Sequence, residues 1–219
     1  MPQVIVKICG LSTPETLEAA IAAGADMAGF MFYQKSPRHI DPATARRLGQ
    51  IAADRIQKVA LSVDADDAAL AAMIEALAPD YLQLHGSETP ERVAAVKARF
   101  GLAIIKAIGV ASAADVASSA AYGAADMLIF DAKPAPDASL PGGNGVVFDW
   151  RLMHGAAPGK PWLLSGGLDE FNVAEAIGIV GAPGVDVSSG VERARGVKDV
   201  GRIAAFVAAA RKTSADSQP

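Results

Sequence analysis

Residues 4–32 read VIVKICGLSTPETLEAAIAAGADMAGFMF and contain one complete strand–helix–strand unit. The apolar runs Val4–Ile8 and Met27–Phe32 are rich in branched and aromatic residues, which predicts a strand for each. Between them, Ser12-Thr-Pro-Glu15 has the pattern of a helix N-terminus with proline in the first turn, and Gly24 is predicted to end that helix. Two strands joined through a helix are the building unit of a parallel sheet.

The same unit recurs along the whole chain. Six further strands are predicted at Lys58–Val63, Tyr81–Leu84, Leu102–Ala107, Met127–Phe130, Trp162–Leu164 and Val185–Ser188. Helices are predicted to begin at Asp41-Pro42, Asp66, Thr89-Pro90 and Ser112, with a short one near Asp149 and two more over about 172–179 and 198–211. The strands are almost continuously apolar, which is typical of a parallel sheet that helices cover on its outer face.

Eight strand–helix units fit either a closed barrel or a doubly wound open sheet. The first strand is not followed by the G-x-G-x-x-G pattern of many doubly wound sheets. A Gly/Ala…Asp pattern also precedes every second strand, at Gly24-Ala-Asp26, Ala78-Pro-Asp80, Gly123-Ala-Ala-Asp126 and Gly181…Asp186. Although it could mark only an economical turn, its recurrence suggests four related pairs of units. We therefore predict a single α/β domain, a (βα)8 TIM barrel over residues 1–212, with a polar C-terminal tail at 213–219.

Composition narrows the classes of function. The 219 residues are 51% hydrophobic, which excludes a disordered chain, and 20 basic against 24 acidic residues give a net charge of −4. We therefore expect no nucleic-acid partner and no membrane partner. The single cysteine excludes a disulfide within the chain and any all-cysteine metal site. Because the sequence has neither a basic leader nor an apolar run of about 18 residues, we expect a cytoplasmic protein.

In such barrels the active site lies where strands end and the following loops begin. Glycine clusters occur in three late loops, at Gly142-Gly-Asn-Gly145, Ser165-Gly-Gly167 and Ser188-Ser-Gly190. Glycine lets backbone N–H groups approach a phosphate closely, and the last two loops are the habitual phosphate site of this fold. Any single cluster could be a tight turn, but together they predict a phosphate-binding site formed by Gly143, Gly145, Gly166, Gly167, Ser188, Ser189 and Gly190.

Two residues at strand ends have side chains suited to proton transfer. Cys9 has the same strand parity as Lys7, so both are expected to face the barrel interior, where a cation favours the thiolate. Lys7 could instead pair with Asp186, and a lone cysteine is often an inert buried residue. Asp131 is expected to point inward at the site mouth, as an acid or as a turn-capping residue.

Two more side chains are candidates for binding. Arg38, in the loop after the second strand, could hold a carboxylate through two hydrogen bonds or be an ordinary solvated charge. His85 follows the fourth strand and is predicted to line the pocket. Since no cluster of histidine and acidic residues has the spacing of metal ligands, we expect neither a metal nor a cofactor.

Several segments resemble phosphoribosylanthranilate isomerase, an enzyme family of tryptophan biosynthesis. The resemblance extends in order from residue 4 to about 200. The segments that carry it are Val6-Lys-Ile-Cys-Gly10, Gly29-Phe-Met-Phe32, Ser36-Pro-Arg38, Leu82-Gln-Leu-His-Gly86, Gly142-Gly-Asn-Gly145, Phe148-Asp-Trp150, Leu164-Ser-Gly-Gly-Leu168 and Val185-Asp-Val-Ser-Ser-Gly-Val-Glu192.

The resemblance implies a function and a role for each candidate residue. The family catalyses an Amadori rearrangement of N-(5'-phosphoribosyl)anthranilate to 1-(2-carboxyphenylamino)-1-deoxy-D-ribulose 5-phosphate, without a cofactor. Cys9 matches its general base, Asp131 its general acid, and Arg38 the residue that holds the anthranilate carboxylate. Asn144 stands where the family usually has a small hydroxyl residue, and the insert at 133–141 also varies in the family. The expected partner is this phosphorylated small molecule, and the expected assembly is a monomer or a homodimer.

Two alternative functions are considered, and only the second belongs to a different class. The first is another sugar-phosphate aldose–ketose isomerase on the same barrel, such as the histidine-pathway enzyme. That enzyme uses two aspartates, one of them at the end of the first strand, and this chain has Cys9 at that position. A non-catalytic phosphate-binding barrel is the other. The joint presence of Cys9, Asp131 and Arg38 argues against it.

Overall fold

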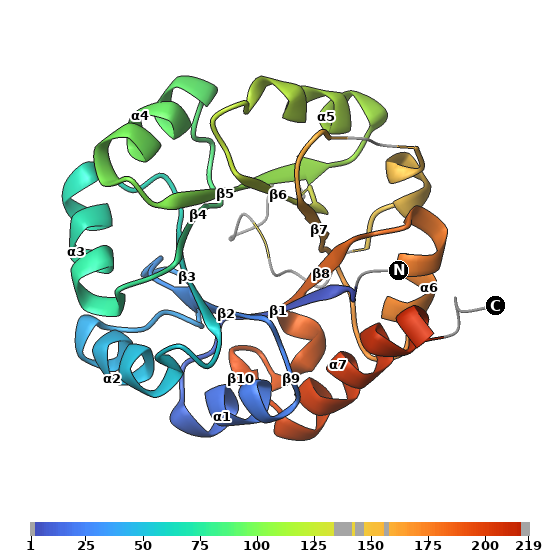
Figure 1. Cartoon of the computed structure of the whole chain (residues 1–219), viewed down its shortest axis with the longest axis horizontal. Coiled ribbons are helices and arrows are strands. Elements are labelled where there is room, and N and C mark those ends of the chain that lie inside the picture. The colour runs from blue at the N-terminus through green and yellow to red at the C-terminus, as the bar shows by residue number, and fades with distance from the viewer. Residues whose placement is uncertain (1–2, 134–141, 143–146, 156–157, 216–219) are drawn as a thin grey trace.

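A computed structural model of the chain describes residues 3–133, 142, 147–155 and 158–215. Eight parallel strands close into a barrel in chain order, which confirms the predicted TIM barrel (Figure 1). They are Ile5–Cys9 (β1), Met27–Met31 (β2), Gln57–Ser62 (β3), Tyr81–Leu84 (β4), Ala103–Val110 (β5), Met127–Ala132 (β6), Trp162–Leu164 (β7) and Gly184–Val187 (β8). The seam pairs Ile5 with Gly184 and Lys7 with Asp186.

Helices surround the barrel in the order that the sequence predicts (Figure 1). They are Pro14–Ala22 (α1), Pro42–Ala52 (α2), Asp67–Leu77 (α3), Pro90–Phe100 (α4), Ala113–Ser118 (α5), Val173–Val180 (α6) and Val200–Ala215 (α7). Short 3-10 helices cover Ser119–Ala121 (η1), Trp150–Met153 (η2) and Ser189–Val191 (η3). Four predicted N-terminal residues, Asp41, Asp66, Thr89 and Ser112, cap their helices by accepting a backbone N–H. In α1 the N-cap is Thr13, which accepts the N–H of Thr16, rather than Ser12, the first residue of the predicted Ser12–Glu15 signal.

The structure differs from the sequence prediction at several boundaries. Strands β1 and β6 extend to include Cys9 and Asp131, which were expected just after the strand ends. Between β6 and β7, the part of the chain that the structure describes contains only the short helix η2. After β8, an unpredicted antiparallel hairpin, β9 (Glu192–Ala194) and β10 (Val197–Lys198), precedes α7. Helix α7 ends at Ala215, three residues inside the predicted tail.

Side chains that face the barrel interior are divided into an apolar and a polar part. The apolar part is a buried cluster of Met27, Val59, Ile105, Ala107, Met127, Ile129 and Leu163. The outward-facing strand residues join the helices in a second, larger core. Buried polar interior residues, Lys7, Gln83, Asp131, Ser165 and Asp186, lie on strands or directly after them. The barrel interior therefore holds these five polar side chains next to the apolar cluster.

Three of the recurring aspartates have one shared structural role. Asp26, Asp80 and Asp126 each stand just before an even-numbered strand. Their carboxylates accept the backbone N–H of Val6, Lys58 and Ile104, at 2.7, 2.7 and 2.8 Å, near the start of the preceding odd-numbered strand. The backbone N–H of each aspartate donates back to the carbonyl of the same strand residue. The fourth, Asp186, differs because it lies within β8 and pairs with Lys7.

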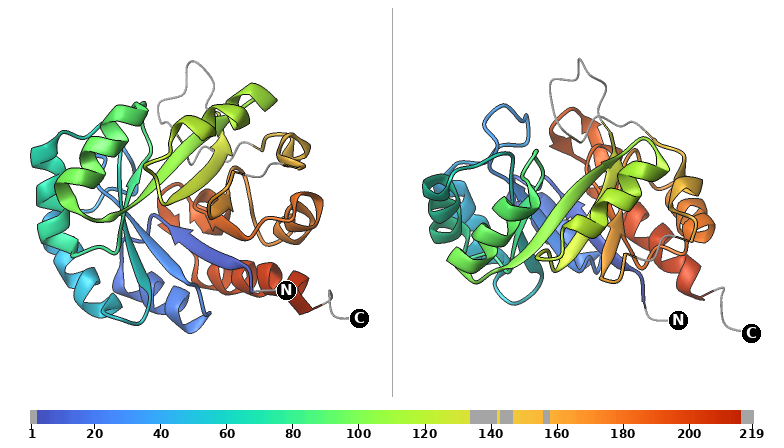
Figure 2. Two further views of the ribbon diagram at one scale, coloured as in Figure 1. Left: turned by 45° about the horizontal axis from the view of Figure 1, so that its top comes forward. Right: turned by 90° about the horizontal axis from the view of Figure 1, so that it is seen from above.

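The two ends of the barrel have different roles. In the side view of Figure 2, the loops that follow the strands gather at one end, whereas β1 begins at the other. The aspartate contacts lie where strands begin, so they hold the end away from the candidate site. Among the described residues, no helix is long and apolar enough to cross a membrane.

Candidate active site

Cys9 ends β1 with a buried side chain beside a buried ion pair. Lys7 Nζ donates to Asp186 Oδ1 at 2.8 Å, and a Cβ added to Gly29 would meet both Cys9 Sγ and Lys7 Nζ within 3.1 Å. Lys7 therefore combines both roles considered from the sequence, since it faces the interior with Cys9 and pairs with Asp186.

Burial raises the pKa of the Cys9 thiol, although the charge of Lys7 opposes this rise. Burial also disfavours the Lys7 ammonium, but the attraction of Asp186 outweighs it and raises the pKa of Lys7. A permanent ammonium therefore lies beside the thiol. A thiolate formed here is a stronger proton acceptor than an exposed one, and Lys7 stabilises its charge.

Arg38 is buried against the end of β1 rather than solvated. Its side chain packs on Gly10, which has a φ of +79°, and a Cβ added to Gly10 would lie only 2.6 Å from Arg38 Cδ. Arg38 Nε donates to Glu192 Oε1 at 2.6 Å and Nη2 donates to Glu192 Oε2 at 3.0 Å. The alternative of an ordinary exposed arginine is thus wrong, and Glu192 fixes the plane of the guanidinium.

Glu192 also contacts Lys198 of β10. Lys198 Nζ donates to Glu192 Oε1 at 2.9 Å, to Ser188 O at 2.8 Å and to Ser188 Oγ at 3.1 Å. Ser188 Oγ in turn donates to Cys9 O at 3.1 Å. This network connects the Arg38 side chain, the loop after β8 and the end of β1, three parts that the sequence places far apart.

The charges in this network shift two pKa values. Burial would raise the pKa of Glu192, but hydrogen bonding from Arg38 and the charge of Lys198 outweigh it and lower that pKa to about 2. Burial lowers the pKa of Lys198 to about 8, against the attraction of Glu192. Glu192 is therefore a carboxylate at neutral pH and remains one into the acid range.

We expect Glu192→Gln to remove an acid-sensitive part of the stability. Lowering the pKa of Glu192 from 4.5 to about 2 corresponds to roughly 3 kcal/mol of stabilisation, present above pH 4.5 and lost as the pH falls towards 2. In urea titrations, the difference in unfolding free energy between wild type and variant should shrink by roughly 2 kcal/mol between pH 6 and pH 3. A difference that stays constant over this range would contradict the assignment.

Asp131 and His85 form the second part of the site. Asp131 ends its inward-facing run on β6 and is 7% exposed, and its Oδ1 accepts the N–H of Ala132 at 2.8 Å. His85 Nε2 lies 3.3 Å from Asp131 Oδ2. Gly142 closes over both, since a Cβ there would lie 2.8 Å from Asp131 Oδ2. The structure thus brings together the predicted acid and the predicted pocket histidine.

The side chain of Gln83 hydrogen-bonds to the His85 ring. Gln83 Nε2 lies 2.9 Å from His85 Nδ1, and with the amide in this orientation Nδ1 is the acceptor. The proton of the neutral ring is then on Nε2, which faces the carboxylate of Asp131. His85 is therefore set to stabilise negative charge on Asp131.

The predicted glycine loops are only partly within the described residues. Gly166 and Gly167 follow β7 with φ of +89° and +64°, a region that favours glycine. Gly190, between Ser189 and Val191 in η3, packs directly on the carbonyl of Leu168 without room for a Cβ. The loops after β7 and β8 therefore touch. The predicted Gly143 and Gly145 lie outside the described residues.

Sequence reasoning missed the partners of these side chains. Gln83 could have been found by its strand parity, because it alternates with outward-facing leucines in Tyr81–Leu84. Glu192 ends one of the segments that carry the family resemblance, but no local signal marks its pairing with Arg38. Within the residues that the structure describes, no group of three or more histidine, cysteine or acidic side chains is arranged to hold a metal ion.

Comparisons with known proteins agree on one family. A model of the N-(5'phosphoribosyl)anthranilate (PRA) isomerase family matches residues 6–209. The N-(5'-phosphoribosyl)anthranilate isomerase of Azorhizobium caulinodans is 57% identical over 215 residues, covering 98% of this chain and 94% of the relative. That of Nitrobacter hamburgensis is 57% identical over 208 residues, covering 94% and 92%.

Solved structures show the same relationship. The crystal structure of phosphoribosyl anthranilate isomerase from Thermotoga maritima has a TM-score of 0.86 and 33% identity, covering 95% of this chain and 99% of that one. A phosphoribosyl anthranilate isomerase in complex with reduced 1-(o-carboxyphenylamino)-1-deoxyribulose 5-phosphate has a TM-score of 0.81 and 32% identity, with the same coverage.

Proposed function

The chain belongs to the N-(5'-phosphoribosyl)anthranilate isomerase family, and on that premise we propose that Cys9 and Asp131 catalyse the family's reaction in it. The reaction is the Amadori rearrangement of N-(5'-phosphoribosyl)anthranilate to 1-(2-carboxyphenylamino)-1-deoxy-D-ribulose 5-phosphate, a step of tryptophan biosynthesis. The family match disfavours both alternatives, a different sugar-phosphate isomerase and a non-catalytic barrel.

Asp131 is the proposed general acid. Its protonated carboxyl gives a proton to the furanose ring oxygen, the C1′–O bond breaks, and C1′ becomes the carbon of a protonated Schiff base with the anthranilate nitrogen. The carboxylate left behind faces His85 Nε2–H at 3.3 Å, which stabilises it as the proton leaves.

Cys9 is the proposed general base. Its thiolate removes the C2′ proton, which the adjacent iminium makes acidic, and the electron pair of the C–H bond neutralises the iminium nitrogen. The resulting enolamine becomes the product when C1′ is protonated and the C2′ hydroxyl loses its proton to give the ketone. The buried ammonium of Lys7 supports the thiolate during this step.

Binding is assigned to the two charged ends of the substrate. We assign the phosphate to the touching loops Gly166–Gly167 and Ser188–Gly190, whose glycine conformations allow close approach of backbone N–H groups. The anthranilate carboxylate is assigned to Arg38, which Glu192 orients. That a structural relative binds the reduced product analogue supports this assignment.

The observation that carries the proposal is the environment of Cys9. A buried thiol lies beside a permanent ammonium, while the backbone of the same residue contacts the loop assigned to phosphate through Ser188. A proton-transfer group is thus fixed beside a proposed phosphate site. The purified chain should convert N-(5'-phosphoribosyl)anthranilate, and the fall in anthranilate fluorescence measures the rate. A folded protein that gives no turnover would refute the proposal.

We expect Arg38→Lys to weaken substrate binding while chemistry continues. Lysine keeps a positive charge beside Glu192 but cannot form two parallel hydrogen bonds to a carboxylate. Loss of one charge-assisted hydrogen bond should raise KM about 10- to 100-fold, with kcat changed less than about threefold.

A substrate without the carboxylate provides the control for this prediction. With N-(5'-phosphoribosyl)aniline, wild type and Arg38→Lys should have the same KM, because neither makes the carboxylate contact. A KM for the natural substrate equal to that of wild type would remove the assigned role of Arg38.

The remaining assignments concern partners and location. The Thermotoga maritima relative is described as dimeric, with monomeric forms made from it, and we assign this chain the monomer or homodimer state. We also assign it to the cytoplasm, with the phosphorylated substrate as its partner and without nucleic acid. Sedimentation at several protein concentrations would identify the oligomeric state.

A further inference from the structure

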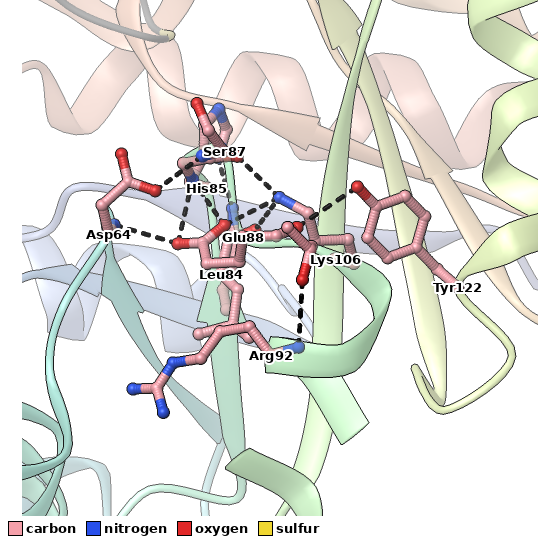
Figure 3. Close-up of polar contacts among 11 residues, drawn as sticks. Asp64, Leu84, His85, Ser87, Glu88, Arg92, Lys106 and Tyr122 are labelled. Atoms are coloured by element: carbon pink, nitrogen blue, oxygen red, sulfur yellow. Dashed lines mark hydrogen bonds and ion pairs between the residues drawn. The ribbon is translucent and has the colours of Figure 1, made fainter. Parts of the chain in front are cut away.

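A buried ion pair outside the proposed catalytic set lies under the loop that follows β4. Lys106 of β5 is 1% exposed and Glu88 is 6% exposed. Lys106 Nζ donates to Glu88 Oε2 at 2.8 Å and to the carbonyls of Gly86 and Leu84 at 2.7 and 3.2 Å (Figure 3). Its three protons therefore all reach acceptors in one short segment.

The Glu88 carboxylate holds the other side of the same loop. It accepts the N–H of Gly86 at 2.9 Å and the N–H of Asp64, in the loop after β3, at 3.0 Å. The Glu88 backbone carbonyl accepts the hydroxyl of Tyr122 at 3.2 Å. Glu88 thus joins the loops after β3 and β4 to β5 (Figure 3).

Asp64 completes the constraint. Its Oδ1 accepts the N–H of Ser87 at 2.7 Å, and its own backbone has a φ of +48°, which few non-glycine residues adopt. A Cβ added to Gly86 would collide with Asp64. These contacts restrict the backbone from Leu84 to Glu88 to one conformation.

His85 is the second residue of this fixed segment. Its backbone N–H donates to Ser62 O at 2.9 Å, and its ring lies between Gln83 Nε2 and Asp131 Oδ2. The 3.3 Å separation of the ring from Asp131 thus depends on where the loop holds the backbone of His85. A small shift of the loop would break the contact with the proposed acid.

We propose that Lys106 and Glu88 are positioning residues that hold His85 Nε2 against Asp131. The proposal rests on the proposed function, because it assigns its effect to the general acid. Desolvating two charges is costly and seldom adds net stability over apolar side chains of the same size. The pair instead determines where the backbone of His85 lies, because its hydrogen bonds hold the main-chain atoms of Leu84 and Gly86 on either side.

A double-mutant cycle on kcat tests the proposal. We expect Glu88→Gln and Lys106→Met each to lower kcat about tenfold in the wild-type background with little change in KM. In a His85→Ala background the same substitutions should change kcat less than twofold, because the contact they support is already gone. Equal factors in both backgrounds, or wild-type kcat in a folded single variant, would overturn the proposal.

Lys97→Met is the matched control. Lys97 forms a 2.7 Å ion pair with Asp126, which lies at the opposite end of the barrel. Its loss should lower the melting temperature without changing kcat. If Lys106→Met does not fold, Glu88→Gln keeps the cycle informative because it preserves the shape of the side chain.

A spectroscopic measurement separates this proposal from the proposed function. The chain has three histidines, so His85→Ala assigns the ring ¹⁵N signals of His85. At a pH high enough to keep histidine rings neutral, wild type should show the proton of this ring on Nε2, and Glu88→Gln should move these signals towards a mixture of both tautomers. Unchanged signals would overturn the positioning role. Absence of turnover by wild type would instead refute the function.

Discussion

Replacing Cys9 by alanine is expected to lower kcat about 10³-fold while leaving KM within a few-fold of wild type. A positioned base contributes about 10²–10⁴-fold to a proton transfer, and no other thiol exists in the chain to replace it. The phosphate and carboxylate assignments do not include the thiol, so ground-state binding should persist. Steady-state kinetics by anthranilate fluorescence would measure both parameters.

Cys9→Ser is the companion variant, because it keeps the size and a polar atom but replaces the thiol by a far weaker acid. It should be nearly as inactive as Cys9→Ala. Thermal unfolding should show both variants folded, since the lysine–aspartate pair beneath the site remains intact. A kcat within about tenfold of wild type in either variant would remove Cys9 from its assigned role.

Asp131→Asn is expected to lower kcat by a similar factor, about 10³-fold, for a different reason. The amide matches the shape of the carboxyl group and can still accept the N–H of Ala132, but it has no acidic proton to give to the ring oxygen. The effect should fall on kcat, since Asp131 is assigned to neither the phosphate nor the carboxylate of the substrate.

Asp115→Asn is the matched control for Asp131→Asn. Asp115 follows β5 at the same end of the barrel and pairs with Lys133 at 3.0 Å. The hydrogen bond from Ala111 is the largest of the interactions that lower the pKa of Asp115 to about 2, which suits a capping residue rather than a proton donor. Its replacement should leave kcat within about twofold. An equal fall in kcat in both variants would mean that the substitutions disturb the structure at this end of the barrel, rather than that Asp131→Asn removes a general acid.

The fold could be predicted because its signals are local. Strand parity was enough to place Lys7 and Cys9 on the same side of β1, and helix starts such as Thr89-Pro90 lie where the sequence pattern indicates. These features depend on backbone geometry within a few residues, so they can be recognised without knowledge of the rest of the chain.

The arrangement of the site depends on contacts that no local pattern encodes. Glu192 and Arg38 are 154 positions apart, and their hydrogen bonds exist only because the closed barrel brings the loops after β2 and β8 together. The hairpin of β9 and β10, which carries Lys198 to Ser188, is likewise too short to show a strand pattern. Lys106 occupies an outward-facing position of β5. Its partner Glu88 reaches it only because of the conformation of the loop after β4, which no sequence pattern shows.

The three aspartate contacts at the base of the barrel also bear on how the chain assembles. Each joins residues only 20 to 22 positions apart, whereas the seam between β1 and β8 joins Lys7 to a residue 179 positions away. Closing a short loop costs less conformational entropy than closing a long one, and proteins rich in contacts between residues close in sequence fold faster. The chain therefore contains three local nuclei that can form early. The ion pair beside Cys9 lies in the seam with this long sequence separation, so the proposed site is complete only when β1 and β8 have paired.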